Sequence, residues 1–273
     1  MSLSGRVVVV TGSTRGIGRA IADACARAGA AVVVSSRTPE DVANAVSQIE
    51  STGAKASGFV LNVGHYEELV ALRDHALEHH GRIDAWVSNA GISNGYRYIE
   101  DESAPEIHDL ITINVIGQLY GAKVMLAYFR EHGGYLMNVC GRGWKGDATP
   151  FTTAYGASKA ASASLTRSLA AENREHTNVS INGFVPGMVD TDFYRDDMPC
   201  SPRLESTRHQ VRLALEAFGT PFEDVGERCA ALLAEEPGHT TGRIYPMIGV
   251  GHAIRGGAKM AWWGMTGKLR PRA

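Results

Sequence analysis

Residues 7–18 read Val7-Val8-Val9-Val10-Thr11-Gly12-Ser13-Thr14-Arg15-Gly16-Ile17-Gly18. The four valines are too short a run for a helix and end at a glycine-containing loop, so they predict a buried strand. From residue 16 to residue 28 the apolar side chains recur at helical spacing, which predicts a helix directly after the loop. Glycines at such a junction allow a tight turn and let a pyrophosphate approach backbone N–H groups at the helix N-terminus. An ordinary tight turn is the alternative, but the flanking strand and helix favour a nucleotide-binding loop formed by Gly12, Ser13, Thr14, Arg15, Gly16, Ile17 and Gly18.

Short apolar runs and amphipathic stretches alternate through the rest of the chain. Further strands are expected at residues 31–35, 56–61, 83–88, 135–140, 179–184 and 243–247, and further helices at 39–53, 67–79, 106–131, 153–175 and 222–234. Strict alternation of strands and helices indicates βαβ units and a parallel sheet covered on both faces. The predicted fold class is therefore α/β, a single-domain doubly wound parallel sheet (Rossmann-like) with helices on both faces. We assign residues 1–251 to this domain, with a substrate lid at 188–215, and residues 252–273 to a C-terminal extension.

Composition and charge argue against several classes of protein. The chain has 273 residues, 44% of them hydrophobic, which is enough for a sizeable core and excludes a disordered chain. Its 27 basic and 29 acidic residues give a net charge of −2, so we expect no nucleic-acid partner. No apolar run approaches the ~18 residues of a membrane-spanning helix, so we expect no membrane partner. The four cysteines show no CxxC or zinc-ligand spacing, and we expect reduced thiols, a cytoplasmic location and no metal site.

The residues that end the second predicted strand indicate which dinucleotide is bound. An acidic residue at this place would hydrogen-bond the ribose hydroxyls of the adenosine, but the sequence has Ser36 and Arg37. The guanidinium of Arg37 can pair with a 2′-phosphate, and Arg15 in the loop can reach the same region. Solvated surface arginines are the alternative interpretation. The pattern favours NADP(H) as the cofactor, with NAD(H) as the second choice.

Tyr155 and Lys159 are four residues apart near the start of a predicted helix, which places them on one face. A free tyrosine has a pKa of about 10 and ionises poorly at neutral pH. We expect the nearby lysine cation to lower that pKa, so that the phenol can give a proton to a carbonyl oxygen or take one from an alcohol. Alone, such a pair is an ordinary helix-surface pair. After a nucleotide-binding loop, it predicts acid–base chemistry.

With these residues identified, the chain resembles the short-chain dehydrogenase/reductase (SDR) family from about residue 5 to residue 251. Residues 11–18 are similar to the family's cofactor loop, and Tyr155 and Lys159 match its catalytic pair. Asn114, in a predicted helix, matches the asparagine that holds a water in the family's proton relay. Further matches are expected around the cofactor, at Asn62-Val63, Ser88-Asn89-Ala90-Gly91, and Pro186-Gly187 with Val189 and Thr191.

This resemblance implies a carbonyl/alcohol oxidoreductase that uses NAD(P) and acts on a small-molecule substrate. It also implies a homo-oligomer, a dimer or the homotetramer common in the family.

The tail at residues 252–273 contains Trp262 and Trp263, and adjacent tryptophans are costly to leave exposed. We therefore expect both to be buried at a subunit interface or over a neighbouring pocket, or to anchor a protein partner.

The family's catalytic serine, which hydrogen-bonds the substrate oxygen, is absent. Aligned on the strand, Gly141 takes its place, whereas counting thirteen residues back from Tyr155 gives Arg142. Three interpretations remain open. In the first, the protein is an active enzyme that polarises the carbonyl with Cys140, Arg142 or a backbone N–H. In the second, it is an enzyme that acts slowly or on substrates that need little polarisation. In the third, it is an NADP(H)-binding sensor or scaffold. The presence of Tyr155, Lys159 and Asn114 together favours an enzyme.

Overall fold

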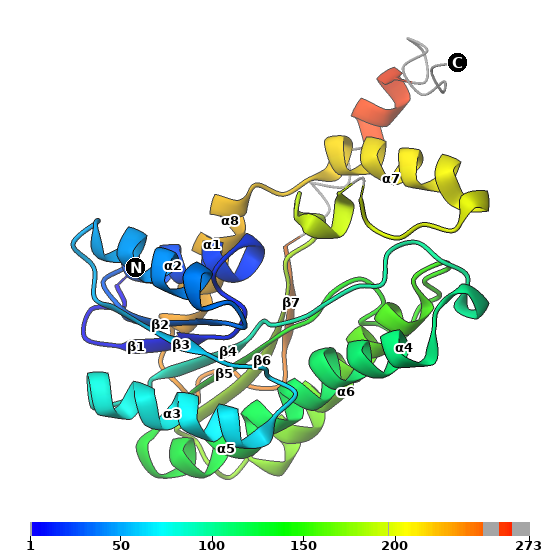
Figure 1. Cartoon of the computed structure of the whole chain (residues 1–273). Coiled ribbons are helices and arrows are strands. Elements are labelled where there is room, and N and C mark those ends of the chain that lie inside the picture. The colour runs from blue at the N-terminus through cyan, green and yellow to red at the C-terminus, as the bar shows by residue number, and fades with distance from the viewer. Residues whose placement is uncertain (1, 196, 248–256, 264–273) are drawn as a thin grey trace.

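A single parallel sheet forms the centre of the molecule. The computed structural model describes residues 2–195, 197–247 and 257–263, and its sheet has the strand order β3-β2-β1-β4-β5-β6-β7 (Figure 1). The strands are β1 (Val7–Val10), β2 (Ala31–Ser36), β3 (Ala56–Val60), β4 (Ala85–Ser88), β5 (Gly134–Val139), β6 (Val179–Val185) and β7 (Ile244–Pro246). All pair in parallel, which confirms the predicted α/β doubly wound sheet. The strand order reverses between β1 and β4, and such a switch point opens a crevice at the carboxyl ends of the strands.

Helices cover both faces of this sheet. On one face lie α1 (Gly16–Arg27), α2 (Pro39–Glu50) and α8 (Phe222–Leu233) (Figure 1). The other face carries α3 (Tyr66–His80), α5 (Gly117–His132) and α6 (Thr153–Glu172). Because helices cover both faces, both faces of each central strand are buried, which explains the uninterrupted apolar runs.

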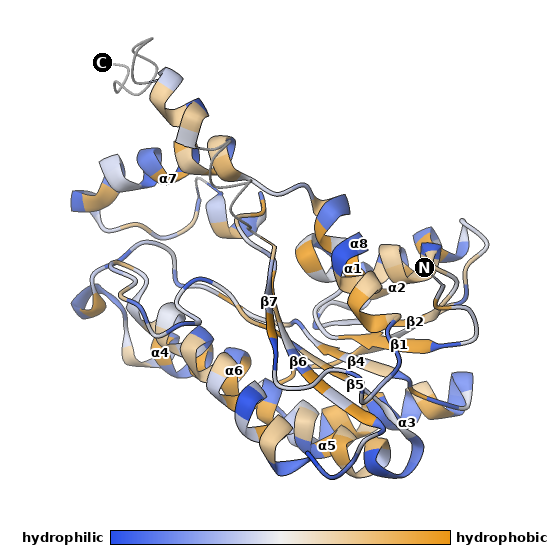
Figure 2. Cartoon of the chain, turned by 180° about the vertical axis from the view of Figure 1, so that it is seen from behind, coloured by the Kyte–Doolittle hydropathy of each residue, from blue (hydrophilic) through white to orange (hydrophobic). Residues whose placement is uncertain are grey.

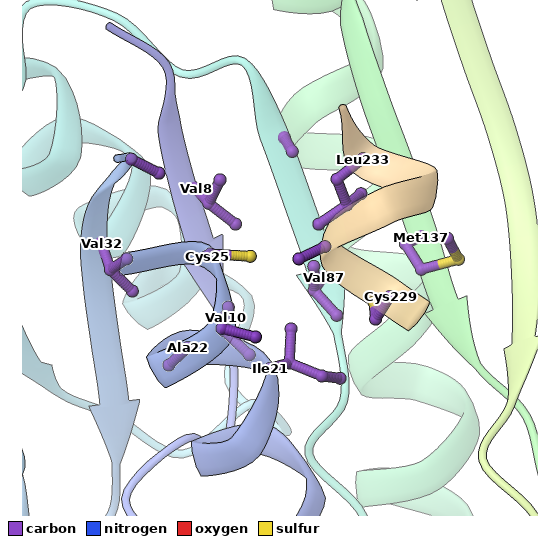
Figure 3. Packing of buried hydrophobic residues seen from close by; sticks show 14 of the residues in the cluster. Val8, Val10, Ile21, Ala22, Cys25, Val32, Val87, Met137, Cys229 and Leu233 are labelled. Carbon is purple, nitrogen blue, oxygen red and sulfur yellow. The ribbon is translucent and has the colours of Figure 1, made fainter. Parts of the chain in front are cut away.

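The four valines of β1 show how one strand serves both layers. Val8 and Val10 pack in the core beneath α1 and α8, whereas Val7 and Val9 belong to the core beneath α3 and α5. All four valines are almost fully buried. Figure 3 shows the first of these cores, in which Val8 and Val10 lie among side chains of α1, α8 and the neighbouring strands: Ile21, Ala22, Cys25, Val32, Val87, Met137, Cys229 and Leu233.

The helix expected at residues 106–131 is interrupted by a π-helical turn. The structure has α4 (Ala104–Ile111), then η2 (Thr112–Ile116), then α5. A π-turn inserts an extra residue into a helix and often marks a functional site, and here it contains the fully buried Asn114. Among the described residues, Ala104–His132 is the one helical stretch long and apolar enough to cross a membrane, by length and composition alone, and half of its most apolar part is buried inside the fold.

The segment expected to be an irregular lid at 188–215 contains a helix. It holds η3 (Asp192–Tyr194), η4 (Pro202–Leu204) and the first part of α7 (Glu205–Phe218), so the predicted end of the lid falls inside α7. No side chain caps the start of α7, and Leu213 is the buried residue of Glu205–Phe218. The usual sequence signals, a cap and a wide buried stripe, are therefore missing. Figure 2 shows α7 standing away from the sheet, beside the short helix at residues 257–263.

Most of the tail lies outside the described residues. In the part that is described, residues 257–263, the ammonium of Lys259 donates a hydrogen bond to the Glu216 carbonyl at 2.7 Å. Trp263 is 6% exposed and Trp262 is 62% exposed. Trp263 is thus buried within one chain, without a subunit interface. Burial of Trp262 against a partner stays a prediction.

Candidate active site

One cavity of about 960 Å³ runs along the carboxyl ends of the strands, from the glycine loop to Tyr155. It brings together nearly every residue that the sequence assigned to a site. Ser13 and Asn114 do not line it but are fully buried behind it. The predicted residues that line the cavity are Gly12, Thr14, Arg15, Gly16, Ile17, Gly18, Ser36, Arg37, Asn62, Val63, Asn89, Ala90, Gly91, Cys140, Tyr155, Lys159, Pro186, Gly187, Val189 and Thr191.

The loop after β1 is compact because two positions require glycine. Gly12 has φ +63°, and a Cβ there would lie 2.9 Å from the Cα of Ala90. A Cβ on Gly18 would collide with the Gly12 carbonyl oxygen and with the side-chain nitrogen of Asn89. That nitrogen donates to the carbonyls of Thr11 and Gly12 at 2.9 and 3.0 Å, which ties the loop to the end of β4.

The same loop leaves the N-terminus of α1 free for an anion. No side chain caps this terminus, and its first turn has no acidic residue. The hydroxyl of Ser13 is instead used within the loop, since it donates to the Val10 carbonyl at 2.6 Å and accepts from the Ser35 N–H at 3.0 Å. Uncapped N–H groups and the helix dipole suit a pyrophosphate. The residues present therefore fit a dinucleotide.

The two arginines expected to bind a 2′-phosphate differ in their surroundings. Arg37 is exposed after β2 and forms no hydrogen bond or ion pair with another described residue. Arg15 pairs with Asp192 of η3 at 2.8 Å, and Asp192 also pairs with Arg195 at 3.3 Å. Arg15 therefore links the glycine loop to the lid.

Tyr155, Lys159 and Asn114 come together at the base of the cavity. The ammonium of Lys159, 4% exposed, donates to the Val139 carbonyl at 3.2 Å and lies 5.5 Å from the centre of the Tyr155 ring. The amide of Asn114 bridges the backbone of Ile92, accepting from its N–H at 2.8 Å and donating to its carbonyl at 2.9 Å. It also donates to the Ser158 hydroxyl at 3.1 Å, which donates in turn to the Tyr155 carbonyl at 2.7 Å.

Burial governs the ionisation of this group. It lowers the pKa of Lys159 from 10.5 to about 8, opposed by the nearby Cys140. Burial, with a contribution from Tyr194, raises the pKa of Tyr155 above its ordinary value. Lys159 is not among the groups that shift the Tyr155 pKa, so the expected lowering by this lysine does not occur in this geometry; loss of water, which disfavours the phenolate, sets the direction.

Of the two candidates for the place of the missing serine, Gly141 is the one that lies against the Tyr155 hydroxyl. A Cβ built on Gly141 would lie 2.7 Å from the hydroxyl oxygen of Tyr155, so a side chain there would touch the reacting group. Cys140 is differently placed. Its thiol donates to the Asn138 carbonyl at 3.7 Å and packs with Ala163 and Val185, and burial raises its pKa to about 11.

An aromatic group that sequence reasoning did not assign to the site closes the cavity over Tyr155. The ring of Phe193, in η3, lies 5.0 Å from Tyr155, 6.1 Å from Tyr96 and 4.9 Å from Tyr194. The backbone of Tyr96 holds the lid, accepting from the Ser201 N–H at 2.9 Å and donating to the Pro199 carbonyl at 3.0 Å. The only sequence signal for these aromatic residues was their position in loops on the substrate side of the sheet. That signal does not show which aromatic residue of such a loop faces the cavity.

No group of three or more His, Cys, Asp or Glu side chains that could hold a metal ion occurs among the described residues. All four cysteines are free, and Cys25, Cys140 and Cys229 are buried.

Comparisons with known proteins define the family. A model of the short chain dehydrogenase family matches residues 6–199, more than half of the chain. Glucose 1-dehydrogenase 2 of Bacillus subtilis is 30% identical over 244 residues, which cover 88% of this chain and 92% of that protein. Human dehydrogenase/reductase SDR family member 4 is 32% identical, with 88% of this chain and 85% of that protein covered. The chain therefore belongs to the short-chain dehydrogenase family, which confirms the resemblance found in the sequence.

Other relatives are longer than this chain. Chlorophyll(ide) b reductase NOL of Oryza sativa subsp. japonica is 37% identical over 193 residues, which cover 68% of this chain and 56% of that protein. This chain thus spans about half the length of some curated relatives that it matches.

Solved structures share the fold. A short-chain alcohol dehydrogenase from Sinorhizobium meliloti has a TM-score of 0.79 and 30% identity, with 93% of this chain and 98% of that chain covered. A metagenomic short-chain oxidoreductase in complex with NADP has a TM-score of 0.72 and 23% identity, with 91% and 100% covered, and shows likeness of fold.

Proposed function

We propose that this protein is an NADP(H)-dependent oxidoreductase that interconverts a carbonyl and an alcohol on a small molecule. One observation carries the proposal: the half-buried Tyr155 and the buried Lys159 lie in the same cavity as an uncapped, glycine-built helix N-terminus. Membership in the short-chain dehydrogenase family supports it.

The cofactor would lie along the carboxyl ends of β1, β2 and β4. Gly12, Gly16 and Gly18 would hold its pyrophosphate against the start of α1. Arg37 would pair with the 2′-phosphate of NADP(H), because it is exposed beside the cavity and no acidic residue stands in its place. When bound, the nicotinamide supplies a hydride for reduction or accepts one for oxidation.

Tyr155 would handle the proton. In reduction its hydroxyl gives a proton to the carbonyl oxygen, and the resulting phenolate is stabilised by the ammonium of Lys159. A lysine with a pKa of about 8 is suited to this work, since near neutral pH it holds a proton and can also release one. Asn114 is a positioning residue, because its contacts join Ile92 to Ser158 beside Tyr155.

The substrate oxygen would lack the usual second donor. Gly141 has no hydroxyl, and the thiol of Cys140 already donates to the Asn138 carbonyl. Losing such a donor typically costs about 10²–10³ in rate. We therefore infer a slow reductase for unactivated ketones and a faster one for aldehydes, which need less polarisation.

Two measurements test the proposal. Wild-type protein should bind NADPH more tightly than NADH, and Arg37→Asp should reduce or reverse that preference, by about tenfold to over a hundredfold for the loss of a charged hydrogen bond. Arg174→Asp is the matched control, since it changes the same charge at an exposed residue just beyond the end of α6. A wild-type preference for NADH would refute the choice of cofactor.

Turnover is the second measurement. Oxidation of NADPH is followed with a panel of aldehydes and ketones, and Tyr155→Phe should abolish it while leaving NADPH binding intact. Near wild-type turnover in Tyr155→Phe would place the proton donor elsewhere. If the protein binds NADPH but turns over no carbonyl or alcohol, the enzyme hypothesis is refuted and the NADP(H)-binding sensor is favoured instead.

A further inference from the structure

The loop after β5 displays one arginine toward the substrate end of the cavity. Arg142 lies between two glycines that are fixed against α6. A Cβ on Gly141 would touch the Tyr155 hydroxyl, and a Cβ on Gly143, which has φ +90°, would lie 2.8 Å from the Cα of Gly156. The N–H of Trp144 donates to the Gly141 carbonyl at 3.1 Å and closes the turn. Two close approaches and one hydrogen bond therefore hold the backbone that carries Arg142.

Arg142 lines the cavity without a partner for its charge. It forms no hydrogen bond or ion pair with another residue that the structure describes. Arg142 lies near the phenols of Tyr96 and Tyr194. Its positive charge acts to lower the pKa of each phenol, although burial raises both pKa values by a larger amount. Tyr96 is 4% exposed, and neither phenol hydroxyl hydrogen-bonds to a residue in the described ranges.

The anion that these groups fit is not part of the cofactor. The pyrophosphate site lies at the end of β1, and Arg142 follows β5, with β4 between them. Neighbouring strands are about 4.8 Å apart, so the two sites are separated by about 10 Å across the sheet. The 2′-phosphate would lie one strand further away, at the end of β2.

We propose that the substrate carries a carboxylate, which Arg142 binds together with the hydroxyls of Tyr96 and Tyr194. A guanidinium matches a carboxylate with two parallel hydrogen bonds, and the phenols of the buried Tyr96 and the half-buried Tyr194 supply the remaining donors. The cavity is also lined by the apolar and aromatic residues Trp144, Phe193, Met198 and Val211, and by the charged residues Lys145 and Asp147 of the same loop. The substrate class is therefore a carbonyl compound with an apolar or aromatic body and one carboxylate near the reacting carbon, because Arg142 is adjacent to the residue that touches Tyr155.

This inference rests on the proposed function, and the test separates the two. The probes are 4-formylbenzoate and its methyl ester, which differ in the charge but carry the same aldehyde. Wild-type kcat/KM should favour the acid by about tenfold or more. Arg142→Gln should lose about tenfold to a hundredfold more activity toward the acid than toward the ester, and Arg142→Lys should recover part of it. Arg174→Gln is the matched control, because it makes the same change at an exposed arginine that does not line the cavity; it should leave the acid-to-ester ratio unchanged.

Two results would overturn the carboxylate site: a wild-type enzyme that does not prefer the acid, or an Arg142→Gln variant that loses acid and ester activity equally. Binding provides a readout that needs no turnover. Calorimetric titration of 4-formylbenzoate into protein saturated with NADP⁺ should show binding in wild type and in Arg174→Gln, and a loss of affinity of about tenfold or more in Arg142→Gln. Such binding without turnover would refute the proposed reaction but uphold the site. Turnover of the ester without binding of the acid would uphold the proposed reaction but refute the carboxylate site.

Discussion

Replacing Gly141 by serine tests whether a missing hydroxyl limits the reaction. The Cβ of that serine would lie 2.7 Å from the Tyr155 hydroxyl and 3.2 Å from Cγ of Lys159, so its own hydroxyl would be next to the reacting phenol. Gly141 is not among the glycines with positive φ, and its backbone therefore accepts a serine without strain. A fixed donor to the substrate oxygen is worth about 10²–10³ in kcat, or about 2.7–4 kcal/mol.

The same Cβ also carries a steric cost. A contact of 2.7 Å is shorter than real Cβ atoms show, so the Tyr155 hydroxyl must move by a few tenths of an ångström. Gly141→Ala adds this Cβ without the hydroxyl and measures the cost alone. We expect Gly141→Ala to fall below wild type, because Tyr155 is displaced, and Gly141→Ser to exceed Gly141→Ala by about 10²–10³ in kcat on a simple ketone.

The assay is NADPH oxidation with one ketone and one aldehyde, with circular dichroism and NADPH titration as controls for folding and cofactor binding. The gain should be larger for the ketone, since its carbonyl needs more polarisation. If Gly141→Ser turns over no faster than Gly141→Ala while both fold and bind NADPH, the reasoning is refuted, and the donor to the substrate oxygen must be another group.

The geometry of the site leads to three further predictions. The pKa of Lys159 is about 8 in the folded chain against 10.5 for an unperturbed lysine, so the unfolded chain binds more protons between those two pH values. The free energy of unfolding of wild type relative to Lys159→Met should therefore rise by about 3 kcal/mol from pH 8 to pH 10.5, measured by denaturant unfolding. Gly18→Ala should abolish NADPH binding, because its Cβ would push apart Gly12 and Asn89, whereas Gly53→Ala, where a Cβ meets nothing within 4 Å, should leave it intact. Asp192→Asn frees Arg15, and since exposed pairs are worth about 0–1 kcal/mol, NADPH affinity should rise by up to about fivefold with NADH affinity unchanged; a loss of NADPH affinity would contradict this.

Sequence reasoning predicted the fold where the signal is local. The valines of β1 form a short apolar run because both faces of that strand are buried, and the glycines after them are required by contacts within the loop itself. The same holds for the Tyr155–Lys159 spacing on α6. Periodicity did not show the π-turn at Asn114, because the inserted residue rotates the apolar face by about 100° within a stretch that is apolar almost throughout. The helix α7 was missed because its start has no side-chain cap and few of its residues are buried.

The residue that replaces the serine could not be assigned from sequence for a different reason. Counting from Tyr155 and aligning on β5 give different residues when the intervening loop differs in length, and only the approach of Gly141 to the Tyr155 hydroxyl decides between them. That result also changes the role left for Arg142. A guanidinium at the serine position would act on the reacting oxygen, whereas a guanidinium one residue further, between two glycines held against α6, is displaced from that oxygen by about 3.8 Å of backbone. In the proposed carboxylate site, the missing donor at position 141 and the charge at position 142 would direct the polar contacts of this loop away from the carbonyl and toward another part of the substrate.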